Sequence, residues 1–163
     1  SVRIGWLLGT PVYVGGTLSA VAIVRSFDPT GAWVLLTMVL AWGSDTSAYF
    51  VGRKFGKTKL APRISPKKTL EGSAGGLAAA VVGAMIMSFF LPGMRVLDAI
   101  ALGILGGAAG QAGDLLMSVL KRSSGVKDSG GILPGHGGIL DRVDALAFTA
   151  PATWAYGHFI LGF

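Results

Sequence analysis

The chain has 163 residues, a formal net charge of +6 and no cysteine, which excludes disulfides and thiolate metal sites. Hydrophobic residues make up 52% of it and charged residues only 13%, against about 25% in a typical soluble domain. So few charges cannot cover a water-facing surface, and the composition predicts one membrane-embedded domain over residues 1–163. The chain begins with Ser1 and shows no signal peptide, so we expect a fragment that begins partway through a longer protein.

Five apolar runs predict the membrane-spanning helices, each of which needs about 20 apolar residues. In chain order they cover residues 4–24, 31–52, 72–91, 96–120 and 145–163. The first, third and fifth runs carry no charge, whereas the second and fourth contain Asp45 and Asp114. We therefore expect an all-α, polytopic membrane protein with about five transmembrane helices. The alternative is a soluble bundle of very apolar helices.

Basic residues are concentrated in two of the loops between these runs. The loop before the third run carries Arg53, Lys54, Lys57, Lys59, Arg63, Lys67 and Lys68, and the loop before the fifth carries Lys121, Arg122 and Lys127. The other two loops carry only Arg25 and Arg95. With five spans both basic loops fall on one side of the membrane, which the positive-inside rule makes cytoplasmic.

Small residues in the third and fourth runs predict close helix packing. Glycines recur three and four residues apart in the fourth run, at Gly103, Gly106, Gly107, Gly110 and Gly113. Residues without a side chain let helix backbones approach one another in lipid. We interpret these glycines as packing residues and not as ligand-binding ones.

Aspartates in or beside the apolar runs are the strongest sign of a functional site, since one at mid-membrane costs about 2.5–3.5 kcal/mol. Asp114 lies about 10 Å before the basic end of its helix, and Asp45 about 12 Å before the end of its own. Asp141 and Asp144 share a face in the first turns of the last helix. All four fall in the same half of the membrane, which predicts one polar cavity open to the cytosol.

Three of these carboxylates suit a metal ion. Asp114, Asp141 and Asp144 come from two helices, and magnesium prefers such oxygen ligands. Helix capping alone is the alternative for the last two. Asp45 is a weaker candidate, because it could equally pair with a lysine or a nearby hydroxyl group. His136, between glycines, could bind phosphate, bind metal or fix a turn.

The two basic loops predict phosphate binding. Residues 118–144 combine bases, acids and glycines, the mixture that holds a metal and phosphate oxygens. Lys67 and Lys68 cannot point the same way on a helix, so one could reach a phosphate while the other faces lipid. A merely positive loop near anionic lipid is the alternative. Thr69 is placed to cap the following helix. Beside apolar spans, this indicates an enzyme acting on a phosphorylated lipid.

Residues 118–144 resemble the signature of the CDP-diacylglycerol synthases, also called phosphatidate cytidylyltransferases. The matching positions are Ser118, Lys121, Arg122, Lys127, Asp128, Pro134, His136, Gly137, Gly138, Asp141, Arg142 and Asp144. The resemblance extends to residues 45–57 and 64–72 and so covers most of the chain. Members of that family are longer, and this chain resembles their C-terminal, catalytic portion.

The resemblance implies transfer of CMP from CTP to phosphatidic acid, which gives CDP-diacylglycerol and pyrophosphate. It also implies magnesium, with manganese as a substitute and a second cation in the same cluster, and a homodimer in a bacterial-type inner membrane. No nucleic-acid partner is expected.

On this hypothesis the catalytic residues are Asp114, Lys127, Asp141, Arg142 and Asp144. The substrate-binding residues are Lys67, Lys68, Ser118, Lys121, Arg122, Asp128, His136, Gly137 and Gly138. A CTP-dependent polyprenol or phytol kinase and a cytidylyltransferase for archaeal lipids are related alternatives. An ion-coupled transporter is an alternative of another class, but the largely apolar outer halves of the spans argue against it.

Overall fold

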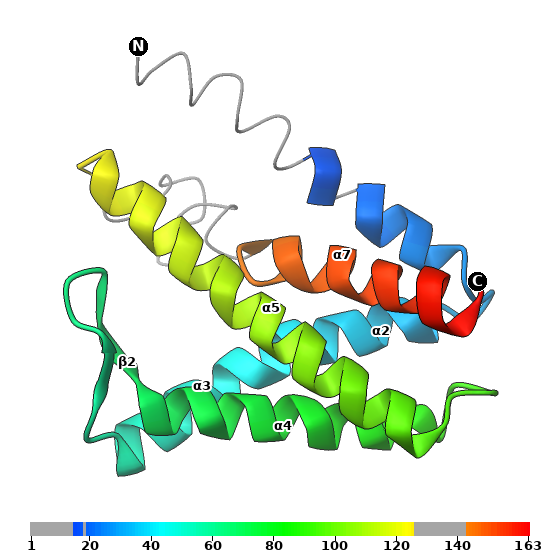
Figure 1. Cartoon of the computed structure of the whole chain (residues 1–163), viewed down its shortest axis with the longest axis horizontal. Helices are drawn as coiled ribbons and strands as arrows, with labels where there is room; N and C mark the ends of the chain where they lie inside the picture. The colour runs from blue at the N-terminus through cyan, green and yellow to red at the C-terminus, as the bar shows by residue number, and fades with distance from the viewer. Residues whose placement is uncertain (1–14, 18, 126–142) are drawn as a thin grey trace.

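The computed structural model describes residues 15–17, 19–125 and 143–163, and this part of the chain is mostly helical (Figure 1). Helix α2 (Ala32–Met38), the π-helical segment η1 (Val39–Gly43) and α3 (Ser44–Phe55) follow one another without a break. The remaining elements are β1 (Lys59–Ala61), β2 (Ser65–Thr69), α4 (Leu70–Ser88), α5 (Val96–Ser123), α7 (Leu146–Tyr156) and the π-helical segment η2 (Gly157–Leu161).

Among the described residues, three helices are long and apolar enough to cross a membrane: Ala32–Phe55, Leu70–Ser88 and Val96–Ser123. They confirm the second, third and fourth predicted runs. The first run is described only from residue 15, as the shorter helix Gly15–Arg25. The last run forms α7, of 11 residues, and η2, of 5, which together fall short of a full span. Five spans therefore remain a prediction.

A β-hairpin replaces part of the predicted all-α architecture. Strands β1 and β2 pair antiparallel, with Lys59 opposite Thr69. The Glu71 carboxylate fixes the chain that enters the hairpin, because it accepts hydrogen bonds from the backbone N–H groups of Lys57 and Thr58, each at 3.1 Å. The Thr69 hydroxyl accepts from the Gly72 N–H at 3.1 Å, so the predicted helix cap is confirmed. The Glu71 bonds join residues 13 and 14 positions apart, which no apolar pattern reveals.

Helices α4 and α5 pack with their backbones close together, as their small residues predict. Small side chains form the buried stripe of α4: Gly72, Gly76, Ala80 and Ala84. A Cβ atom added at Gly103 of α5 would lie 2.6 Å from the Val81 Cα atom, and one at Gly107 would lie 2.8 Å from the Ala80 Cβ atom. Only glycine fits at these points, so the packing interpretation is confirmed.

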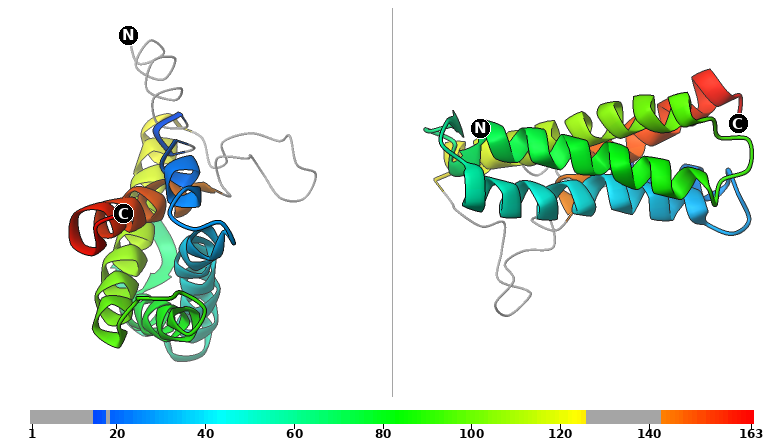
Figure 2. Two further views of the ribbon diagram at one scale, coloured as in Figure 1. Left: turned by 90° about the vertical axis from the view of Figure 1, so that its right-hand side faces the viewer. Right: turned by 90° about the horizontal axis from the view of Figure 1, so that it is seen from below.

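The basic hairpin and the C-terminal end of α5 lie at one end of the bundle, and the Arg25 and Arg95 turns lie at the other (Figure 2). A hydrogen bond of 3.5 Å from the Arg122 Nε atom to the Ile64 carbonyl oxygen joins the hairpin to α5. The predicted segregation of basic loops to one side thus holds for the described residues.

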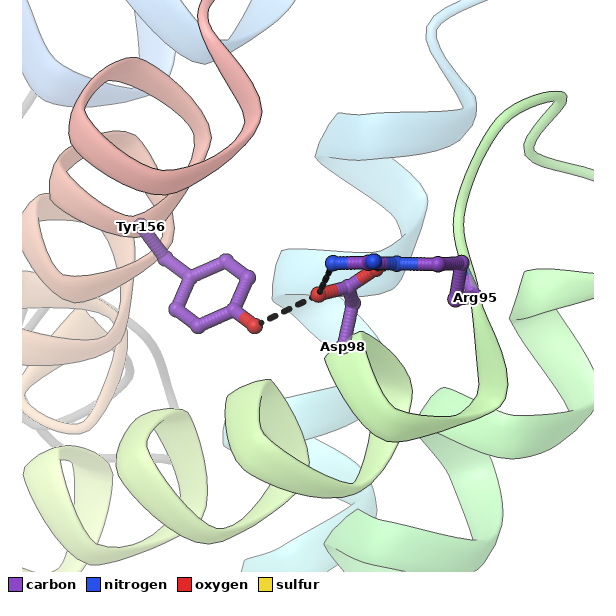
Figure 3. Close-up of polar contacts among 3 residues, drawn as sticks. All are labelled: Arg95, Asp98 and Tyr156. Atoms are coloured by element: carbon purple, nitrogen blue, oxygen red, sulfur yellow. Dashed lines mark hydrogen bonds and ion pairs between the residues drawn. The ribbon is translucent and has the colours of Figure 1, made fainter.

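The opposite end is held by a buried carboxylate that the sequence analysis missed. Asp98 is only 3% exposed and lies in the first turn of α5. Its carboxylate accepts from the Arg95 Nε atom at 3.0 Å and from the Tyr156 hydroxyl at 3.0 Å (Figure 3). The second bond ties the end of α7 to the start of α5.

Replacing Tyr156 with phenylalanine is expected to lower the free energy of unfolding by about 1–2 kcal/mol, because a hydrogen bond to a buried charged group is lost. Thermal unfolding in detergent measures the change. Tyr49→Phe is the matched control, since that exposed hydroxyl only accepts a 3.3 Å bond from Arg53. Equal unfolding temperatures for the two variants would show that the Asp98 contact contributes nothing.

Candidate functional site

A cavity of about 640 Å³ lies at the hairpin end of the bundle. It is bounded by α3, the hairpin, the first turns of α4 and the middle of α5. Four predicted site residues line it: Asp45, Lys67, Lys68 and Asp114. Residues up to 69 positions apart in sequence, as Asp45 and Asp114 are, therefore meet in one polar space.

Charge is arranged in this cavity around one ion pair. The Lys68 ammonium group pairs with the Asp114 carboxylate. Asp45 lies close enough to be repelled by Asp114 and attracted by Lys68. Of the two readings of Asp45, the structure favours a lysine neighbour over a hydroxyl partner. Two carboxylates thus share a single lysine among these three residues, and Arg53, Lys59 and Lys67 add three further cations to the lining of the cavity.

Lys67 and Lys68 lie on strand β2, and the prediction that they point different ways does not depend on a helix. Successive residues of a strand point to opposite faces. Lys68 is partly buried beside Asp114, whereas Lys67 is exposed, yet both line the cavity. The hairpin thus positions one lysine for the acids and presents the other at the surface.

Asp144 is brought to the same acids by the packing of α7 on α5. It is 7% exposed and precedes α7. A Cβ atom at Gly113 would lie 2.7 Å from the Asp144 carbonyl oxygen, so the glycine allows this contact. Burial raises the pKa of the Asp144 carboxyl to about 6, and the charges of Asp114 and Asp45 add to the rise. These three acids therefore gather at one end of the bundle.

The described residues do not by themselves complete a metal site: among them, no three His, Asp or Glu side chains lie close enough to hold one ion. Seven predicted site residues lie outside the described part of the chain, namely Lys127, Asp128, His136, Gly137, Gly138, Asp141 and Arg142. Magnesium binding and the roles of these residues stay predictions.

The other predicted residues lie further along α5. Lys121 is near enough to Asp144 to favour its charged form, and it opposes the rise in that pKa. Arg122 contacts the hairpin at Ile64. Ser118 is half-buried, one turn beyond Asp114. As far as the chain is described, none of Ser118, Lys121 and Arg122 lines the cavity.

Comparison with known proteins identifies the chain's relatives. A family model described as the cytidylyltransferase family matches residues 3–160. The chain belongs to this family. It is similar to the phosphatidate cytidylyltransferase of Brucella abortus, with 39% identity over 94% of this chain and 57% of the relative. It is also similar to the phosphatidate cytidylyltransferase of Bacillus subtilis, with 42% identity over 91% of this chain and 56% of the relative. The enzyme of the same name from Haemophilus influenzae shows 42% identity over 91% of this chain and 54% of the relative. The chain thus spans little more than half the length of these curated relatives.

The cavity is also lined by residues that the sequence analysis did not assign: Tyr49, Arg53, Lys59, Ser73 and Gln111. Gln111 joins two helices. Its side-chain N–H donates to the Ser73 carbonyl oxygen at 2.9 Å, and its side-chain oxygen accepts from the Ser73 hydroxyl. An amide one turn before Asp114 in an apolar run was the signal that could have revealed it.

Replacing Gln111 with leucine is expected to lower the free energy of unfolding by about 1–3 kcal/mol, because two polar groups of Ser73 lose their partner. Thermal unfolding in detergent reports the change. Ser73→Ala is the comparison variant, since it removes only the hydroxyl bond and leaves the 2.9 Å bond from Gln111. If Gln111→Leu unfolds at the wild-type temperature, this pair does not hold α4 against α5.

Proposed function

We propose that this protein transfers CMP from CTP to phosphatidic acid, giving CDP-diacylglycerol and pyrophosphate. One observation carries the proposal: Asp45, Asp114 and Lys68 share a cavity at one end of three helices of membrane length. Phosphoryl chemistry needs acids and cations together, and a lipid substrate needs them at the depth of its headgroup. The names of the relatives supply the identity of the two substrates.

The donor set fits a divalent metal in its chemistry. Asp114 and Asp144 bring carboxylate oxygens, and their mutual repulsion is relieved only in part by Lys68 and Lys121. A hard cation such as magnesium, or manganese in its place, is the natural counter-charge for such oxygens. We propose Asp114, Asp141 and Asp144 as its ligands, with Asp45 beside them for a second cation. The metal would neutralise charge on the phosphate oxygens.

The residues of the chain then bind and orient the two phosphorylated substrates. Lys67 and Lys68 would hold the lipid phosphate, while Lys121, Arg122, Lys127 and Arg142 would hold the triphosphate, with arginine suited to bidentate contacts. A phosphate oxygen of the lipid forms a bond to the α-phosphorus of CTP, and the bond to pyrophosphate breaks in line. The attacking oxygen is already an anion, so no general base is needed.

We further propose a multi-pass arrangement with five spans in a bacterial-type inner membrane and the cavity facing the cytoplasm. The basic residues at the cavity end support this orientation. The family resemblance suggests a homodimer, which stays a prediction.

Two labelled forms of CTP test the function in detergent with phosphatidic acid and magnesium. Label in the α-phosphate should enter the extracted lipid, while label in the γ-phosphate should leave as pyrophosphate. Entry of the γ-label into lipid would instead identify a kinase, and absence of both labels from lipid would reject lipid phosphate as the acceptor.

A further inference from the structure

The hairpin end carries more positive charge than the cavity uses. We define the hairpin surface as six exposed residues: Arg53, Lys54, Lys57, Lys59, Arg63 and Lys67. Glu71 is the only acid between residues 46 and 97, and its carboxylate is occupied by backbone N–H groups of Lys57 and Thr58 at 3.1 Å. Within the described residues, no ion pair neutralises any of the six cations.

The hairpin surface divides into two sets. Arg53, Lys59 and Lys67 line the cavity. The outer set, Lys54, Lys57 and Arg63, stands outside the described lining of the cavity, so the proposed transfer of CMP gives these three charges no task. Like charges gathered on one surface repel one another, and an external anion would offset that repulsion.

Exposed aromatic side chains place this surface at the level of lipid headgroups. Tyr49, Phe50 and Phe55 are 60%, 63% and 57% exposed near the end of α3. The Lys54 Nζ atom lies 5.2 Å from the centre of the Phe55 ring. Aromatic rings with flanking lysines at the end of a membrane-length helix are typical of the boundary between hydrocarbon and headgroups.

We propose that Lys54, Lys57 and Arg63 bind the headgroups of anionic phospholipids. Each cation near an anionic membrane surface adds attraction, and three cations from the end of α3 to the turn of the hairpin act together. A second consequence rests on the proposed function: because phosphatidic acid is itself an anionic lipid, the same surface concentrates it beside the mouth of the cavity. The occupant is the lipid surface and not the nucleotide.

Lipid retention tests the binding without any need for activity. The detergent-solubilised protein is mixed with equal amounts of phosphatidylglycerol and phosphatidylcholine, and native mass spectrometry measures how much of each lipid stays bound. The wild type should keep the anionic lipid at least about fivefold in preference. Lys54→Gln/Lys57→Gln/Arg63→Gln should lose the preference, whereas Lys54→Arg/Lys57→Arg/Arg63→Lys should keep it. Salt at about 0.5 M roughly halves the electrostatic screening length and should weaken the preference of the wild type for the anionic lipid. Equal retention of both lipids by the wild type would overturn the proposal.

Kinetics in neutral mixed micelles test the consequence for catalysis. In the glutamine variant the half-saturating mole fraction of phosphatidic acid should rise about fivefold, with kcat and the KM for CTP unchanged. A raised KM for CTP with an unchanged lipid requirement would show that the surface steers the nucleotide, and would overturn the lipid assignment. Complete absence of cytidylyl transfer in the wild type would reject the proposed function alone, because lipid retention is measured separately.

Discussion

Asp144→Asn is expected to reduce cytidylyl transfer on the order of 100-fold or more while leaving the protein folded. Asparagine keeps the volume and the side-chain oxygen that accepts a 2.8 Å hydrogen bond from the Ala145 N–H. It removes the negative charge and replaces the second carboxylate oxygen with an NH₂ group, and both changes weaken a metal ligand beside Asp114. The α-labelled CTP assay measures the loss.

The same substitution should raise the free energy of unfolding at high pH, which would show that the buried negative charge of Asp144 destabilises the metal-free protein. The pKa of Asp144 is raised from 3.8 to about 6, so the folded protein holds this proton more tightly than the unfolded chain does. The folded state therefore loses stability as pH rises from about 4 to above 6. In metal-free buffer, Asp144→Asn should be more stable than the wild type at pH 8, on the order of 2 kcal/mol. The difference should shrink as pH falls through 6.

Asp28→Asn is the matched control for this prediction. Asp28 is a carboxylate at the opposite end of the bundle, where it accepts from the Thr30 N–H at 3.0 Å and the Ala32 N–H at 2.8 Å. The hydrogen bond from the Thr30 hydroxyl, at 2.6 Å, is the main cause that holds the pKa of Asp28 below its usual value, and the bonds from the two N–H groups add to it. Losing its charge should leave transfer intact and give no gain in stability at pH 8. Near-wild-type transfer by Asp144→Asn would remove Asp144 from the proposed ligand set.

The features that the sequence predicted are those that depend on local properties. Apolar length identified the helices that contain Asp45 and Asp114, because each run must by itself be long and apolar enough to cross the lipid. The spacing of small residues identified close packing at Gly113, because that spacing is also a property of a single helix. The gathering of Asp45, Asp114 and Asp144 followed from depth alone, because helices that alternate in direction return to the same membrane face.

The features that the sequence missed depend on partners distant in the chain. The hairpin forms where Glu71 reaches back to the backbone of Lys57, a bond across 14 residues. Gln111 meets Ser73 across 38 residues, and Tyr156 meets Asp98 across 58. Gln111 and Tyr156 are each a polar residue in an apolar run, so a pattern based on apolar periodicity does not reveal them. An unexplained polar residue within a span is therefore a signal worth pursuing before the fold is known.

Gly113→Ala is expected to reduce cytidylyl transfer about tenfold or more by moving Asp144 away from Asp114. The added Cβ atom would lie 2.7 Å from the Asp144 carbonyl oxygen and 2.8 Å from the Phe148 Cδ2 atom. The first neighbour is backbone, which cannot rotate aside as a flexible side chain can, so the start of α7 must shift as a unit. A displacement of about 1 Å at a reacting centre costs on the order of 100-fold in rate. The α-labelled CTP assay and thermal unfolding measure the two effects.

Gly43→Ala is the matched control, since it adds the same methyl group two residues before Asp45. Its Cβ atom would meet only the Val39 Cγ1 atom, at 3.8 Å, which is an ordinary contact. Alanine also favours the helical backbone over glycine by about 1 kcal/mol. Gly43→Ala should thus keep wild-type transfer and an equal or higher unfolding temperature. If Gly113→Ala behaves in the same way, close contact between α5 and α7 does not set the position of Asp144, and the acids must be aligned by other parts of the chain.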